Sequence, residues 1–415
     1  MTLSSVVIVG AGQAGYQTAA SLRQLGFAGR ITLLSDEDEL PYQRPPLSKA
    51  YLLGQLDERR LLHRQEKWYA DQGVTLLCDA AVAIDRAGHA VTTASGASVP
   101  YDHLVLATGA HNRPLPVPGA ELGGVFGMRV KADADALAPL LGAGARVIVV
   151  GAGFIGLEFA SVAAKLGASV HVVEVADRPM ARALSAETAA FFRAAHERWG
   201  TTFDFGAGLA RIDGADGRVG GVTTSDGRAL PADLVVYGIG VVPNTALAEA
   251  AELAVANGIV VDERLLTADP DVSALGDAVS FPCAQLGGAP MRLESVQNAA
   301  DQARHVAARL LGRADVYGAL PWFWSEQGDL NLQIAGLSLG CDRVVDLAGV
   351  GENEKAVLCF RGGVLVAVET VNRPADHMAA RRMLAGHPEL TVAEAEASGF
   401  DLTAWERAHA LATAG

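Results

Sequence analysis

The feature that most constrains this 415-residue chain is a glycine-rich turn near its start, set between a strand and a helix. Residues 6–36 read as an apolar strand, a turn with Gly10, Gly12 and Gly15, a helix, a second strand and then Asp36. Glycines permit the tight turn, and the first N–H groups of the helix face any phosphate bound there. The acid can hydrogen-bond ribose hydroxyls, although the glutamate after it is an alternative. The segment predicts a dinucleotide site rather than a turn that only packs helix on strand.

The same pattern occurs again at residues 146–174. Its turn contains Gly151, Gly153 and Gly156, and its second strand ends in an acid, Glu174. A second copy in the same order favours an internal repeat.

A further pair of segments extends the repeat. Residues 92–109 and 223–240 each contain a strand, a Ser-Gly or Asp-Gly turn, a Pro-x-Asp lead-in and a buried strand that ends in glycine. Two matched pairs in the same order are hardly accounted for by chance. The sequence therefore predicts two nucleotide-binding lobes.

The remaining segments complete the domain prediction. Residues 294–311 read as an amphipathic helix, and after residue 321 apolar or alternating runs around glycine turns indicate an antiparallel sheet closed by a helix at 374–384. We predict an α/β fold with two Rossmann-like dinucleotide-binding domains and a C-terminal α+β domain. The expected bounds are 1–110 with 241–320 for the first, discontinuous lobe, 111–240 for the second lobe and 321–415 for the C-terminal domain.

Charge and composition limit the classes of partner and the cell compartment that we expect for this protein. A formal net charge of −14 argues against nucleic acid as a partner. The N-terminal apolar run is too short for a signal peptide, and the most apolar stretch is broken by glycines and charges, so we expect no membrane span and a cytoplasmic protein. The cysteines are too scattered for a disulfide framework or a C-x-x-C site, so we expect no bound metal. They are Cys78, Cys283, Cys341 and Cys359.

Several short motifs resemble one known superfamily. The stretches ATG at 107–109, GIGVVPNT at 238–245 and LGD at 275–277 are similar to those of the FAD-dependent pyridine-nucleotide reductases. A second set of motifs resembles a narrower group, the NADH:ferredoxin reductases of bacterial oxygenase systems. These motifs are PYQRPPLSKAYL at 41–52, RLESVQNA at 292–299, PWFWSEQ at 321–327 and VNRP at 371–374.

The resemblance implies an oxidoreductase with FAD in the first lobe, NADH in the second and a C-terminal domain over the flavin. Such an enzyme takes a hydride from NADH onto FAD and passes single electrons to a transient partner, a 2Fe-2S ferredoxin, which serves a cytochrome P450 monooxygenase or a Rieske dioxygenase. The related disulfide reductases carry a C-x4-C pair after the ribose acid. This chain has PPLSK at 45–49 instead, so we do not expect disulfide substrates.

The glycine turns and the motifs together give the expected cofactor contacts. Gly10, Gly12, Ala14 and Gly15 should cradle the FAD pyrophosphate, Asp36 the ribose and Asp277 a ribityl hydroxyl. The resemblance adds the FAD contacts Lys49, Val82, Thr108, Gly109, Arg129 and Val296. The expected NADH contacts are Gly151, Gly153, Ile155, Gly156, Glu174 and Gly240. A carboxylate at position 174 repels a 2′-phosphate, so NADH should be preferred, although Arg178 and Arg182 could weaken the preference.

Lys49, Glu158 and Trp322 are the candidate catalytic residues. A buried lysine or glutamate is costly unless paired, so we expect a Lys49–Glu158 pair beside the reacting flavin ring. The alternatives are a solvated loop lysine and a glutamate that only complements the helix dipole. Trp322, with Trp324, could stack near the flavin or form the exit surface, or the two could be ordinary packing residues.

Docking of an acidic ferredoxin to an acidic enzyme requires a local basic patch. The candidate residues are Arg304, Arg309, Arg313, Arg381 and Arg382, and the alternative is that they are solvated surface residues. Two other functions stay open: a reductase of rubredoxin, oxygen or a small oxidant, and a nucleotide-sensing flavoprotein resembling apoptosis-inducing factor. We expect a monomer or weak dimer.

Overall fold

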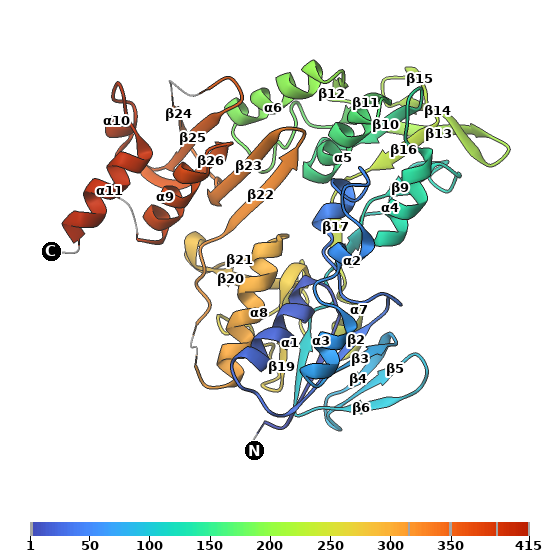
Figure 1. Ribbon diagram of the computed structural model, residues 1–415, viewed down its shortest axis with the longest axis vertical. Helices are drawn as coiled ribbons and strands as arrows, with labels where there is room; N and C mark the ends of the chain where they lie inside the picture. The colour runs from blue at the N-terminus through green and yellow to red at the C-terminus, as the bar shows by residue number, and fades with distance from the viewer. Residues whose placement is uncertain (1–2, 314–315, 348–350, 387–388, 414–415) are drawn as a thin grey trace. The chain divides into compact units, whose positions relative to one another are not determined.

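The structure is a computed structural model that describes residues 3–313, 316–347, 351–386 and 389–413 (Figure 1). Its contacts divide the chain into two compact units, and each is described by itself. The first unit comprises residues 1–43, 57–111 and 241–319. The second unit comprises residues 44–56, 112–240 and 320–415.

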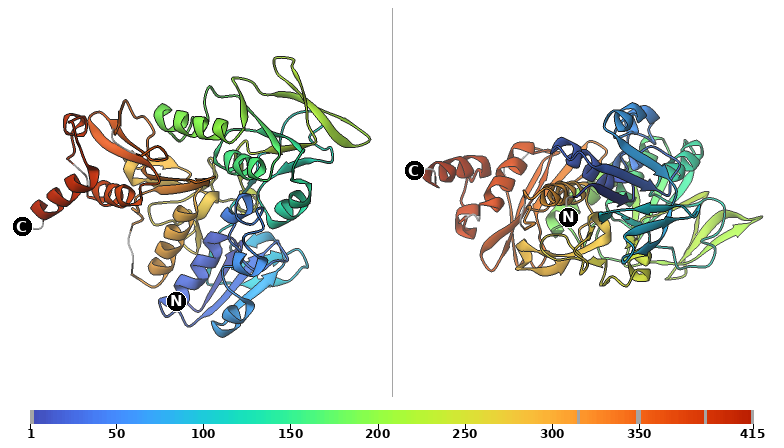
Figure 2. Two further views of the ribbon diagram at one scale, coloured as in Figure 1. Left: turned by 45° about the horizontal axis from the view of Figure 1, so that its top comes forward. Right: turned by 90° about the horizontal axis from the view of Figure 1, so that it is seen from below.

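The first unit is built on a five-stranded parallel sheet with the order β3-β2-β1-β7-β19. Its strands are β1 (Ser5–Val9), β2 (Arg30–Ser35), β3 (Val74–Cys78), β7 (His103–Leu106) and β19 (Val272–Ala274). Helices α1 (Gln13–Gln24) and α8 (Val296–Leu310) lie side by side against each other, as Figure 2 also shows. Strand β1 is fully buried and is apolar after Ser5, as expected of a central parallel strand.

The second unit repeats this sheet with the order β12-β11-β10-β16-β9. Its strands are β9 (Val125–Gly127), β10 (Arg146–Val150), β11 (Ser169–Glu174), β12 (Thr202–Phe205) and β16 (Leu234–Tyr237), and α5 (Phe154–Lys165) follows β10. Strand β10 pairs with β11 and β16 as β1 pairs with β2 and β7. The predicted internal repeat is therefore confirmed.

The second pair of repeated segments is also confirmed. Each forms part of a three-stranded antiparallel sheet, β4-β5-β6 in the first unit and β13-β14-β15 in the second. In each unit the small sheet leads into a buried parallel strand, β7 or β16. The strands are β4 (Ala81–Asp85), β5 (Ala90–Thr93), β6 (Ser98–Pro100), β13 (Leu209–Ala215), β14 (Arg218–Thr224) and β15 (Ala229–Pro231).

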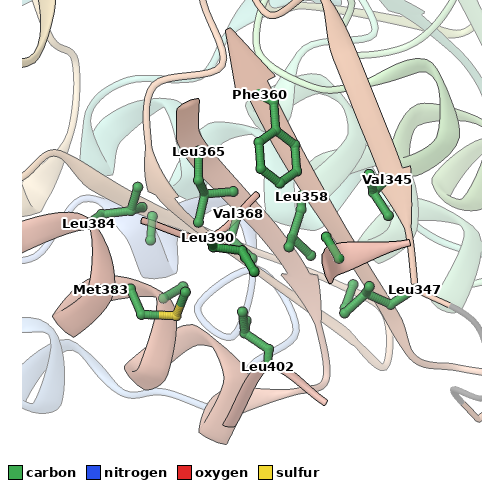
Figure 3. Packing of buried hydrophobic residues seen from close by; sticks show 14 residues of the cluster. Val345, Leu347, Leu358, Phe360, Leu365, Val368, Met383, Leu384, Leu390 and Leu402 are labelled. Atoms are coloured by element: carbon green, nitrogen blue, oxygen red, sulfur yellow. The ribbon is translucent and has the colours of Figure 1, made fainter. Parts of the chain in front are cut away.

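The C-terminal part of the second unit is a five-stranded antiparallel sheet with the order β22-β23-β26-β25-β24. Its strands are β22 (Trp322–Gln327), β23 (Leu330–Gly336), β24 (Arg343–Asp346), β25 (Lys355–Arg361) and β26 (Val364–Val371). Helix α9 (Pro374–Ala385) packs on one face, where Leu358, Phe360 and Met383 belong to a buried apolar cluster (Figure 3). The sheet and the closing helix match the prediction from the sequence.

Further helices and short segments connect these layers. Helix α8 begins after Ser295, whose hydroxyl accepts the Asn298 N–H at 3.0 Å and so caps the predicted amphipathic helix. The other helices are α2 (Glu58–Leu61), α3 (Glu66–Asp71), α4 (Lys131–Leu137), α6 (Ala186–Arg198), α7 (Ala246–Ala250), α10 (Val392–Ala395) and α11 (Leu402–Thr413). The short strands are β8 (Ala110–Asn112), β17 (Val241–Pro243), β18 (Ile259–Val260), β20 (Val279–Cys283) and β21 (Ala289–Met291). The 3-10 turns are η1 (Pro45–Ser48), η2 (Ala138–Leu140), η3 (Gly276–Ala278) and η4 (Ala284–Leu286).

Among the described residues, no helix has both the length and the apolar character that a membrane span requires.

Candidate functional site

The first glycine turn has the geometry of a phosphate cradle. A Cβ atom at Gly10 would lie 2.2 Å from the Ala107 carbonyl oxygen, and one at Gly15 would lie 1.8 Å from that of Gly10. Gly10 also has a φ of +103°, which disfavours any side chain. Gly12 caps α1 without a side-chain hydrogen bond, and a Cβ there would meet nothing within 4 Å. The turn is therefore closed on its inner side and open in front of the helix N-terminus, which fits the pyrophosphate of a dinucleotide.

The acid after the second strand lies where a ribose contact is expected. Asp36 follows the last residue of β2 and is exposed. The neighbouring Glu37 uses its Oε2 atom to accept the hydroxyl of Tyr42 at 2.5 Å. Asp36 stays the predicted ribose contact, with Glu37 as the alternative.

The LGD turn is held from α8 by a residue that the sequence did not single out. The Gly276 N–H donates to Oε1 of Gln302 at 2.7 Å, and the Gln302 side chain is fully buried. Gly276 has a φ of +79°, so a glycine is needed where the chain turns from β19 toward Asp277. The sequence signal that could have identified Gln302 is a glutamine on the buried face of an amphipathic helix.

The other predicted FAD contacts fall into different surroundings. Thr108 donates its hydroxyl to the Asn244 carbonyl at 2.7 Å, and the Asn244 amide donates to the Thr108 carbonyl at 2.8 Å, which fixes the backbone before Gly109. Val82 is an exposed large apolar side chain, with 54% of its surface accessible. Val296 is the first residue of α8 and is half-buried, whereas Lys49 and Arg129 belong to the second unit.

The second glycine turn has the same construction as the first. A Cβ atom at Gly151 would lie 2.7 Å from the Gly238 carbonyl oxygen, and one at Gly156 would lie 2.2 Å from that of Gly151. Gly153 caps α5 without a side-chain bond, and the apolar Ile155 behind it is 36% exposed. Gly240 has a φ of +97° and open space beside its Cα atom. This turn also fits a dinucleotide.

Glu174 ends β11 and connects it to the glycine turn. Its Oε2 atom accepts the Ala152 N–H at 2.6 Å, and its Oε1 atom accepts the Ala176 N–H at 2.8 Å. A carboxylate offers about four lone-pair positions, so these bonds leave room for ribose hydroxyls.

The structure brings Lys49 and Glu158 together. The Lys49 Nζ atom lies 2.8 Å from Oε2 of Glu158, with side chains that are 14% and 7% exposed. Lys49 is therefore not a solvated loop lysine, and Glu158 does more than complement a helix dipole. Ser48 also donates to Oε2, and Ser325 donates to Oε1, each at 2.7 Å. The sequence did not identify the two serines, because only the tertiary fold brings them to Glu158.

Trp322 packs within the C-terminal domain. Its ring centroid lies 5.7 Å from that of Trp324 and 5.4 Å from that of His377, and the Arg381 guanidinium lies 4.5 Å above the ring. Burial lowers the pKa of His377 to about 4, so this histidine is neutral near pH 7. The contacts of Trp322 within this unit are thus aromatic and cationic, and its catalytic role stays a prediction.

The candidate docking arginines differ in their exposure and in the bonds that their guanidinium groups already make. Arg304 is exposed and pairs with Asp301 on its own helix at 2.8 Å. Arg309 instead donates to the buried Ser273 hydroxyl at 2.5 Å, and burial lowers its pKa. The Arg309 guanidinium therefore already serves a bond within the first unit, and its docking role stays a prediction. Arg382 is bound by both oxygens of Glu406, at 2.8 and 2.9 Å.

The cysteines take no part in either turn. All four thiols are free, and Cys283 and Cys359 are buried. Burial raises the pKa of Cys283 above its usual value. Among the described residues, no cluster of three or more His, Cys, Asp or Glu side chains could hold a metal ion.

Comparison with known proteins identifies the family. Residues 4–303 match the pyridine nucleotide-disulphide oxidoreductase family, and residues 322–405 match the reductase C-terminal family. The rhodocoxin reductase of Rhodococcus erythropolis is 49% identical over 96% of this chain and 93% of its own length.

Solved structures also match nearly the whole chain, two reductases among them. The ferredoxin reductase for the CYP199A2 system from Rhodopseudomonas palustris has a TM-score of 0.94 and 47% identity, covering 97% of this chain and 100% of that one. Putidaredoxin reductase in its covalent complex with putidaredoxin has a TM-score of 0.94 and 36% identity, covering 99% of both chains. The chain belongs to the pyridine nucleotide-disulphide oxidoreductase family, and within it to the ferredoxin reductases that carry the reductase C-terminal domain.

Proposed function

We propose that this enzyme takes a hydride from NADH onto FAD and passes single electrons to a 2Fe-2S ferredoxin that serves a cytochrome P450 or a Rieske dioxygenase. The observation that carries the proposal is the presence of two complete dinucleotide turns together with a buried Lys49–Glu158 pair. The relatives' names, rhodocoxin reductase and putidaredoxin reductase among them, support the same chemistry.

FAD would be held by the first unit's glycine turn. Gly12 and the start of α1 would face its pyrophosphate, Asp36 its ribose and Asp277 its ribityl chain. Bound FAD supplies the chemistry, because it accepts electrons as a pair and releases them singly. The full set of proposed FAD contacts is Gly10, Gly12, Ala14, Gly15, Asp36, Lys49, Val82, Thr108, Gly109, Arg129, Asp277 and Val296.

NADH would be held by the second turn. Gly153 and the start of α5 would face its pyrophosphate, and Glu174 would accept its adenosine ribose hydroxyls. A 2′-phosphate would meet the charge of this carboxylate, so NADH is preferred to NADPH. The proposed NADH contacts are Gly151, Gly153, Ile155, Gly156, Glu174 and Gly240.

Lys49 and Glu158 are proposed to act on the reacting ring of the flavin. The pair is largely removed from water, so the ammonium keeps its position through its ion pair and exerts a stronger field than it would in water. Lys49 would present positive charge to the ring as it gains electrons, and Glu158 would hold Lys49. Trp322 is proposed to pack on a bound cofactor or on the route to the partner.

The proposal also covers the domain bounds, the oligomeric state and the cell compartment. The FAD domain would comprise 1–110 and 241–320, the NAD domain 111–240 and the C-terminal domain 321–415. The protein would be a monomer or weak dimer that meets ferredoxin transiently, and it would work in the cytoplasm, where four free thiols persist.

The proposal is tested with purified enzyme and a panel of acceptors. NADH should support reduction of a 2Fe-2S ferredoxin, read as ferredoxin-dependent reduction of cytochrome c. Turnover with rubredoxin or oxygen but with no ferredoxin would replace the proposed partner. Flavin that NADH cannot reduce at a catalytic rate would favour a nucleotide-sensing role.

A further inference from the structure

Strand β22 buries two polar side chains that the proposed chemistry does not by itself require. Ser325 and Gln327 are both 0% exposed, and they alternate along the strand with exposed or half-buried residues. Burying a polar side chain costs free energy unless it is hydrogen-bonded, and an apolar side chain would avoid this cost. These two positions therefore call for a reason other than packing.

The two side chains belong to one directional chain of hydrogen bonds. His196 of α6 lies with Nε2 at 2.9 Å from Oε1 of Gln327, whose Nε2 atom donates to the Ser325 hydroxyl at 3.2 Å. Ser325 in turn donates to Oε1 of Glu158 at 2.7 Å. Burial lowers the pKa of His196 to about 4, so the ring is neutral near pH 7 and carries its proton on Nε2 to reach the Gln327 oxygen. Each donor thus fixes the orientation of the next group.

We propose that Ser325, supported by Gln327 and His196, is a positioning residue that fixes the Glu158 carboxylate against Lys49. Oε2 of Glu158 is bound by Ser48 and Lys49, so a bond to Oε1 is needed to stop the carboxylate from rotating. Because the Gln327 amide occupies the acceptor side of the Ser325 oxygen, the single hydroxyl hydrogen stays directed at Glu158. The inference rests on the proposed function, since it gives the Lys49–Glu158 pair its fixed geometry.

The first test compares Ser325→Ala with Thr370→Val. Thr370 is equally buried in the same sheet and donates its hydroxyl to the Gln333 carbonyl, so its variant controls for the loss of any buried hydroxyl. In anaerobic stopped-flow experiments, Ser325→Ala should slow flavin reduction by NADH about tenfold and change the Kd for NADH by less than about twofold. Thr370→Val should leave both values within about twofold. Equal rates in Ser325→Ala and wild type would overturn the proposal.

The second test asks whether Ser325 acts through Glu158. In a Glu158→Gln background, adding Ser325→Ala should slow flavin reduction by less than about twofold, because the group that Ser325 positions has already been changed. A further tenfold loss would contradict the proposal. If Ser325→Ala does not fold, Gln327→Leu should slow the reaction about threefold in the wild-type background and leave Glu158→Gln unchanged.

The same cycle measured by thermal unfolding separates the two proposals. The Tm losses of Ser325→Ala and Glu158→Gln should be less than additive whether or not the enzyme uses NADH. If NADH cannot reduce the wild-type enzyme, the proposed function is wrong, but the Tm losses of the two variants should still be less than additive. Additive Tm losses together with normal NADH turnover would instead end the inference about Ser325.

Discussion

The two glycine-turn units share one backbone plan but differ at the fifth residue of the nucleotide helix. In α1 this residue is Gln17, which donates to Ser21 on its own helix at 3.0 Å. In α5 it is Glu158, which is buried and bound by Lys49, Ser48 and Ser325. The repeat therefore supplies two glycine turns, and among the differences between the helices the one at this position marks the copy that holds the candidate catalytic pair.

The units also differ where the second strand ends. The strand registers place Ser35 of β2 at the position of Glu174 of β11, because Val9 pairs with Leu34 and Val150 pairs with Val173. Glu174 is bound to two backbone N–H groups, whereas the acid of the first unit comes one residue later and is exposed. The two proposed ribose contacts are therefore built differently.

The largest effect should come from a substitution that fills the space inside the first glycine turn. Gly15→Ala would place a methyl group 1.8 Å from the Gly10 carbonyl oxygen, so the turn must open, and we expect colourless protein with FAD affinity reduced at least about a hundredfold. Gly156→Ala makes the same clash in the second unit and should keep FAD while losing NADH binding. Absorbance at the flavin band and NADH titration distinguish the two. Equal FAD loss in both variants would contradict the assignment of cofactors to units.

The next largest effect should come from changing the fifth residue of the nucleotide helix in the second unit. Glu158→Gln makes the second unit resemble the first, and it should slow flavin reduction by NADH at least about tenfold with FAD still bound. Gln17→Ala, the matched change in the first unit, removes only a bond within its own helix and should alter Tm and rate little. Stopped-flow absorbance measures both rates. Normal reduction of Glu158→Gln would remove the pair from the mechanism.

Cofactor preference should be set by the acid of the second unit. Glu174→Arg should lower kcat/KM for NADH about tenfold and raise it for NADPH, because the carboxylate is replaced by a cation that can bind a 2′-phosphate. The bonds to Ala152 and Ala176 are lost as well, so a small fall in Tm is expected. Wild-type enzyme that uses both cofactors equally would count against this assignment.

A smaller effect is expected at the ferredoxin surface. Because the chain carries a net charge of −14, an acidic ferredoxin must bind a local basic patch, and Arg304→Glu should raise the KM for ferredoxin about fivefold and flatten its salt dependence. Arg193→Glu is the matched control, since Arg193 also lies on an exposed helix face and pairs with an acid on that helix. NADH-dependent ferricyanide reduction should not change in either variant. Identical KM values for the two variants would place docking elsewhere.

The smallest effect should follow from removing the cysteines. Replacing all four by Ala leaves no thiol, and hydride transfer from NADH to the flavin should stay within about twofold of wild type. The buried positions 283 and 359 could cost about 1 kcal/mol each in stability. Loss of flavin reduction in a folded variant that binds FAD would reveal thiol chemistry.

The sequence predicts local features of this molecule well and long-range ones poorly. Glycine spacing and apolar runs are local, so the two turns and their flanking strands were predictable. The bond from Ser325 to Glu158 joins residues 167 positions apart, and no local pattern announces it. Gln302 and Arg309 are intermediate cases, because both lie on or beside the buried face of α8, and helical periodicity could have indicated that Arg309 points inward.

The most direct test is the stoichiometry of electron transfer under anaerobic conditions. Enzyme that contains FAD is mixed with a limiting amount of NADH and an excess of oxidised 2Fe-2S ferredoxin, and the ferredoxin absorbance is followed. We expect about two ferredoxins reduced per NADH, because one hydride carries two electrons and each ferredoxin takes one. Flavin that NADH reduces but that transfers no electrons to any ferredoxin would contradict the proposed function.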